Sequence, residues 1–80
     1  MSTSEKIASE LADTTIAIME RSGDDRLHFH VAKLLGASSQ TLEEAYLTEV
    51  RVRIAGKTAK AFLKGKVEEL KNTAKTAGKE

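Results

Sequence analysis

Apolar residues recur every three or four positions along most of this chain, and that spacing places them on one face of an α-helix. Ile7, Leu11 and Ile18 follow it in the first segment. Ser4 stands where it could cap the N-terminus of this helix, and Gly23 stands where the helix should end. The pattern therefore predicts a mainly α-helical fold.

A second helix is expected directly after Gly23. Asp24 or Asp25 can cap it, and Gly36 can stop it. Its apolar face would consist of Leu27, Val31, Leu34 and Leu35. Residues 27–31 also alternate between apolar and polar side chains, so a short strand is the competing prediction for them.

The third helix should begin near Thr41, because Glu44 follows three residues later in the pattern of a capping box. Beyond it, residues 49–64 admit two predictions. Three apolar residues alternate with arginines there, as in a strand: Val50, Val52 and Ile54. A β-hairpin near residues 49–64 would turn at Gly56, whereas the flanking residues favour helix.

The last apolar residues again have helical spacing, and they are Ala59, Phe62, Leu63, Val67 and Leu70. We therefore expect a small domain of three to four helices over residues 1–71, with the short β-hairpin as the alternative for residues 49–64. Residues 72–80 lack apolar periodicity, which predicts a disordered tail. A core of this size stabilises a fold by only about 3–5 kcal/mol, so a homo-oligomer is expected.

The composition excludes several classes of protein. No cysteine is present, which excludes a disulfide framework and a thiolate metal site. No apolar run approaches the roughly 20 residues that span a bilayer, so we expect no membrane partner and a cytoplasmic location. Charge is divided along the chain: residues 1–50 hold nine acidic and four basic residues, and residues 51–80 hold three acidic and nine basic ones. This division predicts either an anion-binding end or head-to-tail association.

Residues 28–47 contain the elements of two helices joined by a tight turn. Ala32 is small enough for the helices to approach closely, and Gly36 could adopt the positive φ that the turn would need. Four apolar residues would point inward, namely Val31, Leu35, Leu42 and Ala45. This segment, about a quarter of the chain, resembles the bacterial helix-turn-helix DNA-binding motif.

The resemblance implies a set of DNA contacts. It places Ser38, Ser39, Gln40 and Thr41 nearest the bases, and it puts Lys33 within reach of a phosphate. Glu43 and Glu44 depart from what such a motif needs, since carboxylates in the recognition helix repel phosphates.

A basic stretch follows, with no acidic residue between Val50 and Val67. It consists of Arg51, Arg53, Lys57, Lys60, Lys64 and Lys66. As a hairpin this stretch would form a basic wing beside the helix-turn-helix, and as a helix it would form a lysine ridge opposite Phe62 and Leu63. Either form offers cations to the DNA backbone, and either is also compatible with a solvated surface.

The sequence offers no catalytic or metal-binding pattern. His28 and His30 are the only histidines, they point in different directions on a helix, and no third ligand is placed beside them, so we expect them at a surface or an interface. No serine or threonine is placed beside a histidine and a carboxylate, and the glycines form no phosphate loop. We expect no enzyme activity, cofactor or metal.

Together these patterns favour a small DNA-binding regulatory or accessory protein, of the kind found in bacteria, phages or plasmids, whose partner is duplex DNA. The first alternative is a helical protein-interaction module, such as an inhibitor or adaptor, whose acidic half binds a basic protein surface. The second alternative is a self-assembling helical protein in which the acidic end of one copy meets the basic end of the next.

Overall fold

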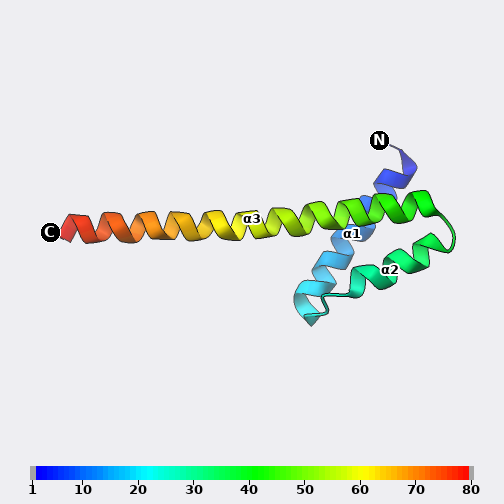
Figure 1. The fold of residues 1–80 in the computed structure, drawn as a ribbon, viewed down its shortest axis with the longest axis horizontal. Coiled ribbons are helices and arrows are strands. Elements are labelled where there is room, and N and C mark those ends of the chain that lie inside the picture. Colours follow the sequence, from blue (N-terminus) through cyan, green and yellow to red (C-terminus); the bar gives the residue numbers. More distant parts are fainter. Residues whose placement is uncertain (1, 80) are drawn as a thin grey trace.

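A computed structural model describes the backbone of residues 2–79 and the side chains of residues 2–73. Three helices make up this part of the chain, α1 (Thr3–Ser22), α2 (Leu27–Gly36) and α3 (Gln40–Lys79). In Figure 1, α1 and α2 pack against the N-terminal half of α3, and the rest of α3 projects alone. The molecule measures 64 × 29 × 13 Å. We call the packed region the head and residues 59–73 the arm.

The expected helical fold is confirmed, whereas the β-hairpin near residues 49–64 is wrong, because this whole segment lies within α3. Gly56 does not interrupt α3, so the helices expected before and after it form a single helix. Alanine and lysine surround Gly56 and favour helix. The helix also places Val50 in the core, with Val52 exposed on another face. The alternation of valines therefore reflects two faces of a helix.

The first helix begins two residues earlier than expected. Its N-cap is Ser2 and not Ser4, since the Ser2 hydroxyl accepts a hydrogen bond of 3.2 Å from the Glu5 backbone N–H. Its end at Gly23 is confirmed. Gly23 has φ 75°, and its N–H donates to the Met19 carbonyl at 2.9 Å.

Neither Asp24 nor Asp25 caps α2. The Asp24 carboxylate accepts a hydrogen bond from the Arg26 N–H at 3.0 Å, which closes the connection before the helix, and Arg26 itself is the N-cap. Residues 27–31 are helical, so the competing strand prediction is wrong. The expected apolar face is also wrong at Leu34, which is 74% exposed, because the helix buries His28 and Ala32 instead.

The start of α3 is capped by Ser39 and not by Thr41. The Ser39 hydroxyl accepts a hydrogen bond of 3.1 Å from the Leu42 N–H, whereas Thr41 is exposed. At its other end, α3 includes residues 72–79 of the expected disordered tail. The side chains of residues 74–79, and all of residue 80, lie outside what the structure describes.

The core of the head is small and lies where the three helices meet. Ala8 and Ala12 come from α1, Ala32 from α2, and Tyr46 and Val50 from α3. The alanines have short side chains, which lets α1 and α2 approach α3 closely. Partly buried apolar residues surround this cluster, among them Leu11, Ile16, Val31, Leu35, Leu42, Ala45 and Leu47.

Tyr46 carries the one polar contact across the centre of the head for which both side chains are buried. Its hydroxyl lies 2.7 Å from the Thr15 hydroxyl, which itself donates to the Leu11 carbonyl at 2.8 Å. Because a hydroxyl has one proton, Tyr46 is the donor to Thr15. Burial raises the pKa of Tyr46 above its usual value.

This burial predicts a loss of stability at high pH. In the unfolded chain the tyrosine ionises near its ordinary pKa of about 10, whereas in the fold its pKa is raised. Its contribution to stability is therefore fully present below about pH 10 and is lost as the pH rises through the raised pKa. Tyr46→Phe should lack this component and should cost about 1 kcal/mol at neutral pH through the lost hydrogen bond. Urea unfolding from pH 8 to 11 measures the stability of each protein and how it changes with pH. Tyr46 is the sole tyrosine, so its absorbance reports the titration directly. Identical pH dependence in the two proteins would contradict the prediction.

Candidate functional site

The residues of the helix-turn-helix resemblance lie at the corner between α2 and α3. Lys33, Ser38, Gln40 and Thr41 are exposed there. Ser39 is only partly exposed, and its hydroxyl is engaged in the cap of α3. The structure therefore brings four of these five side chains to one accessible corner.

Gly36 does not play the part expected for it. It is the last residue of α2, and among the described residues only Gly23 has a positive φ. A Cβ at Gly36 would lie 2.6 Å from an oxygen of the Glu43 carboxylate. The Glu43 carboxylate therefore occupies the space beside Gly36, and the expectation of a left-handed turn residue is wrong.

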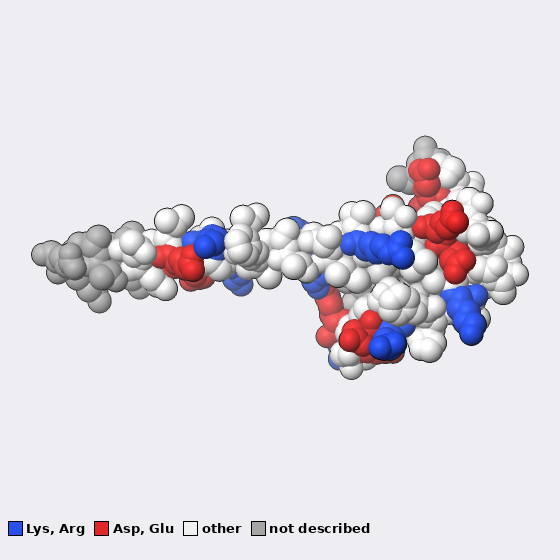
Figure 2. All heavy atoms as spheres, viewed as in Figure 1, with Lys and Arg blue, Asp and Glu red and all other residues white. Residues whose placement is uncertain are grey.

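Carboxylates line the surface beside this corner. A hollow near the start of α3 is bordered by Glu5, Glu44 and Glu49, with Thr41 and Thr48 between them. Figure 2 shows acidic side chains gathered at this end of the head. An anion approaching Thr41 would meet these carboxylates, which weakens the case for phosphate binding here.

Arg53 is an internal anchor. Its Nε donates to Asp13 at 2.8 Å, Nη1 donates to the Glu49 carboxylate at 2.7 Å and to the Glu49 carbonyl, and Nη2 donates to the carbonyl and hydroxyl of Ser9. The hydrogen bond with Glu49 contributes most to raising the pKa of Arg53. A guanidinium has five N–H donors, so none is left for a phosphate. Arg53 holds α1 against α3 through these bonds.

The other cations of the basic stretch differ in their partners. Lys57 is paired with Glu20 of α1, and Lys66 is paired with Glu69 at 3.3 Å. Arg51, Lys60 and Lys64 are exposed, and no ion pair is formed by them within the described residues. The expected wing is replaced by a helix on which Lys60 and Lys64 follow the last ion pair with α1, whereas Arg51 lies within the head.

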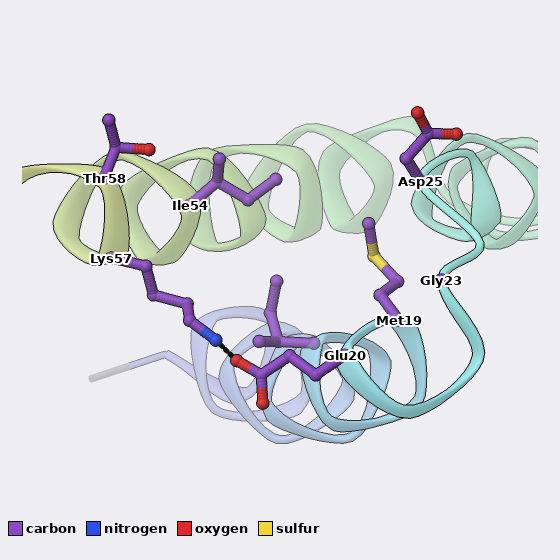
Figure 3. Close-up of a pocket in the computed structure, with 8 residues that line it drawn as sticks. Met19, Glu20, Gly23, Asp25, Ile54, Lys57 and Thr58 are labelled. Atoms are coloured by element: carbon purple, nitrogen blue, oxygen red, sulfur yellow. Dashed lines mark ion pairs between the residues drawn. The ribbon is translucent and has the colours of Figure 1, made fainter. Parts of the chain in front are cut away.

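A small apolar pocket lies between the end of α1 and the middle of α3 (Figure 3). Ile16 and Met19 line it from α1 and Ile54 lines it from α3, with the Glu20–Lys57 ion pair at its edge. Its volume is about 250 Å³. Among the described residues, no three metal-ligating side chains gather in one place.

His28 is buried, contrary to the expected surface position. It is 9% exposed, its ring lies 4.1 Å from the Phe29 ring, and its Nδ1 has no hydrogen-bond partner. His30 is exposed on the same helix. The two histidines therefore do not converge on a common ligand.

An apolar stripe with exposed side chains runs along α3, and we call it the α3 stripe. It consists of Val52, Ala59, Leu63, Val67 and Leu70. Val52, Leu63 and Leu70 are 62%, 60% and 71% exposed. A helix turns about 100° per residue, so Leu63 and Leu70 lie within about 20° of Val52 around the helix.

The α3 stripe does not continue the face of α3 that packs into the head. Val50 is fully buried against the other helices, and Val52 lies about 200° further around α3. The sequence predicted the apolar spacing from Ala59 onward. It did not predict that Val52 begins the stripe, since the orientation of α3 in the head was unknown.

None of the described helices is both long and apolar enough to cross a membrane. No protein-family model, curated protein or solved structure matches this chain. The functional argument therefore depends on the geometry of the α3 stripe and of the cations beside it.

The anchoring role of Arg53 can be tested by substitution. Arg53→Lys retains the charge but supplies three donors in place of five, so the free energy of unfolding should fall by about 1–2 kcal/mol. Urea denaturation measures this change. Arg51→Lys is the matched control on the exposed side of α3 and should change stability by less than about 0.5 kcal/mol. Equal effects would show that the Arg53 contacts do not stabilise the head.

Proposed function

We propose that this protein is a self-associating helical protein whose α3 stripe pairs with the α3 stripe of a second copy. The observation that carries the proposal is the row of exposed apolar side chains on the side of α3 that the head leaves uncovered. Burial of one Leu or Val side chain stabilises a complex by about 1.5–3 kcal/mol. Pairing two stripes would therefore remove several apolar side chains from water, which favours association.

The free arm also needs a partner for its own stability. Isolated helices shorter than about 12–15 residues are marginal in water, and most helical stability in proteins comes from packing. All fifteen residues of the arm have exposed side chains. Gly65 lies within it and lowers its helix propensity by about 1 kcal/mol relative to alanine. Association would provide the packing that the head does not give to the arm.

The total surface supports association. The chain exposes 6258 Å², whereas a compact protein of 8.7 kDa exposes about 4,700 Å². A standard protein interface buries about 800 Å² on each partner. The extra surface is sufficient for one such interface.

Charge favours a second copy over a basic partner protein. Lysines border the α3 stripe, among them Lys60 and Lys66. A basic surface at the stripe would be repelled by them. A second copy carries the same lysines, but it also brings the carboxylates of its own acidic head, so complementary charge is present within the same sequence.

Sedimentation equilibrium tests the proposal. The unaltered protein should show a monomer–dimer equilibrium, and Leu63→Glu should weaken it at least about 100-fold, because two buried leucines are replaced by charges. Ala61→Glu is the matched control, since it adds the same charge on the side of α3 away from the stripe. A monomer at several hundred micromolar, or equal effects of the two substitutions, would overturn the proposal.

DNA binding is the second candidate function. It is favoured by one observation, the exposure of Lys60 and Lys64 on one side of the arm without ion-pair partners in the described residues. With Arg53 and Lys57 engaged by α1, the remaining basic contacts would come from Lys33, Arg51, Lys60 and Lys64. The corner residues Ser38, Gln40 and Thr41 would be the base contacts of a helix-turn-helix regulator.

Fluorescence anisotropy with genomic-fragment DNA in about 50 mM salt tests this candidate, since non-specific binders of this class bind at micromolar concentrations. Replacing Lys60 and Lys64 with Gln should weaken binding and reduce the salt slope by about 2 if each contacts one phosphate. Replacing Glu43 and Glu44 with Gln should strengthen binding. Absence of binding at tens of micromolar protein would reject the candidate.

A further inference from the structure

We infer that two copies pair through α3 in antiparallel orientation, with the twofold axis crossing the pair at the level of residue 61 along the helix. This inference rests on the proposed self-association and specifies its geometry. The α3 stripe runs from Val52 to Leu70, and residue 61 is its midpoint. With the axis there, the entire stripe of one copy is covered by the entire stripe of the other.

The residues that oppose one another in this register are complementary in size. Val52 opposes Leu70 of the second copy, and Ala59 opposes Leu63 of the second copy. Gly56 opposes Lys66 of the second copy, where the missing side chain leaves room for the lysine stem to extend toward solvent. Each layer therefore pairs a smaller residue with a larger one, which is how helices interdigitate in antiparallel pairs.

Charge selects the antiparallel direction. A parallel pair would place the acidic heads together, and it would also place the basic arms together. In the antiparallel pair centred at residue 61, residues 64–73 of each copy lie along residues 49–58 of the other copy's head. The line of the α3 stripe continues toward the start of α3 through Thr48, Ala45 and Thr41, which border the acidic hollow. The second copy's arm thus runs toward carboxylates.

One specific ion pair follows from this register. Arg51 is exposed and forms no ion pair within the described residues. Glu69 lies at the same angle around α3 as Arg51, because eighteen residues are five full turns of a helix. The twofold axis brings Glu69 of the second copy to within about two residues, or 3 Å along the helix, of Arg51. Both side chains are long enough to meet across the pair, and Glu69 would then contact Arg51 of the other copy as well as its own Lys66.

From Val52 onward the head leaves the α3 stripe uncovered. Val50 and Tyr46 mark the face of α3 that α1 and α2 cover, and this face lies about 120–160° around the helix from Val52. Nearer the start of α3, Glu5 of α1 borders the line of the stripe at Ala45, so the pairing extends only as far as that hollow. Each head would lie on the outer side of its own helix, at one end of an elongated dimer. Figure 1 shows the arm extending clear of the head, with its length free for contact.

Spin labels distinguish the orientations. The chain contains no cysteine, so Lys71→Cys provides one labelling site per copy in the full-length protein. In the antiparallel pair the two labels are offset by twenty residues, about 30 Å along the helix, whereas a parallel in-register pair gives no offset. A pulsed dipolar distance near or above 30 Å is expected. A distance below about 20 Å would overturn the antiparallel pair and leave self-association intact, and absence of any dimer would overturn both.

Charge reversal tests the register. Arg51→Glu and Glu69→Arg should each weaken dimerisation about 3- to 10-fold, and the double variant should recover most of the loss. The matched control combines Arg51→Glu with Glu68→Arg, which lies on another side of α3 and should restore nothing. Within one chain Arg51 and Glu69 are about 27 Å apart, so recovery requires two copies. Additive losses in the double variant would overturn the register centred at residue 61.

Discussion

The crossing of α1 over α3 is the contact on which the rest of the head depends. Ala8 and Ala12 let the two helices approach, and Tyr46 fills the space beside them. Its hydroxyl is hydrogen-bonded to the Thr15 hydroxyl in the buried centre of the head, where an unpaired hydroxyl would cost about 1–3 kcal/mol. Arg53 then fixes the rotation of α3 about its own axis through its bonds to α1. That rotation determines which side of α3 faces solvent.

Much of the fold could be predicted because local chemistry determines it. Gly23 ends α1 since a left-handed residue is needed there, and apolar spacing is sufficient to indicate helices. The N-cap of α1 lies two residues before the predicted one because Ser2 and Ser4 are chemically equivalent as caps, so the sequence alone does not choose between them. The valine and arginine alternation at residues 50–54 satisfies both strand and helix patterns. The burial of Val50 against α1 favours the helix, and that contact is remote in sequence.

The candidate site was predictable in its spacing but not in its orientation. The cations were visible in the sequence, yet the Arg53 acceptors on α1, Asp13 and Ser9, lie 40 and 44 residues away, so its engagement could not be predicted from a run of basic residues. Lys57 is similarly paired with a distant glutamate. Tertiary contacts therefore divide the basic residues of the helix into those bonded to another helix and those that are not. Only the free cations remain available for a ligand.

Gly56 and Gly65 give α3 a further property. Nothing lies within 4 Å of a Cβ placed at Gly56 or Gly65, so neither glycine is needed for close packing within one copy. Each lowers the local stability of the helix, and local opening is the step that exposes a backbone to cleavage. An unpaired copy would therefore present a proteolytically sensitive segment, and a paired copy would protect it. The glycines would make cellular lifetime depend on abundance, so that chains lacking a partner are removed first.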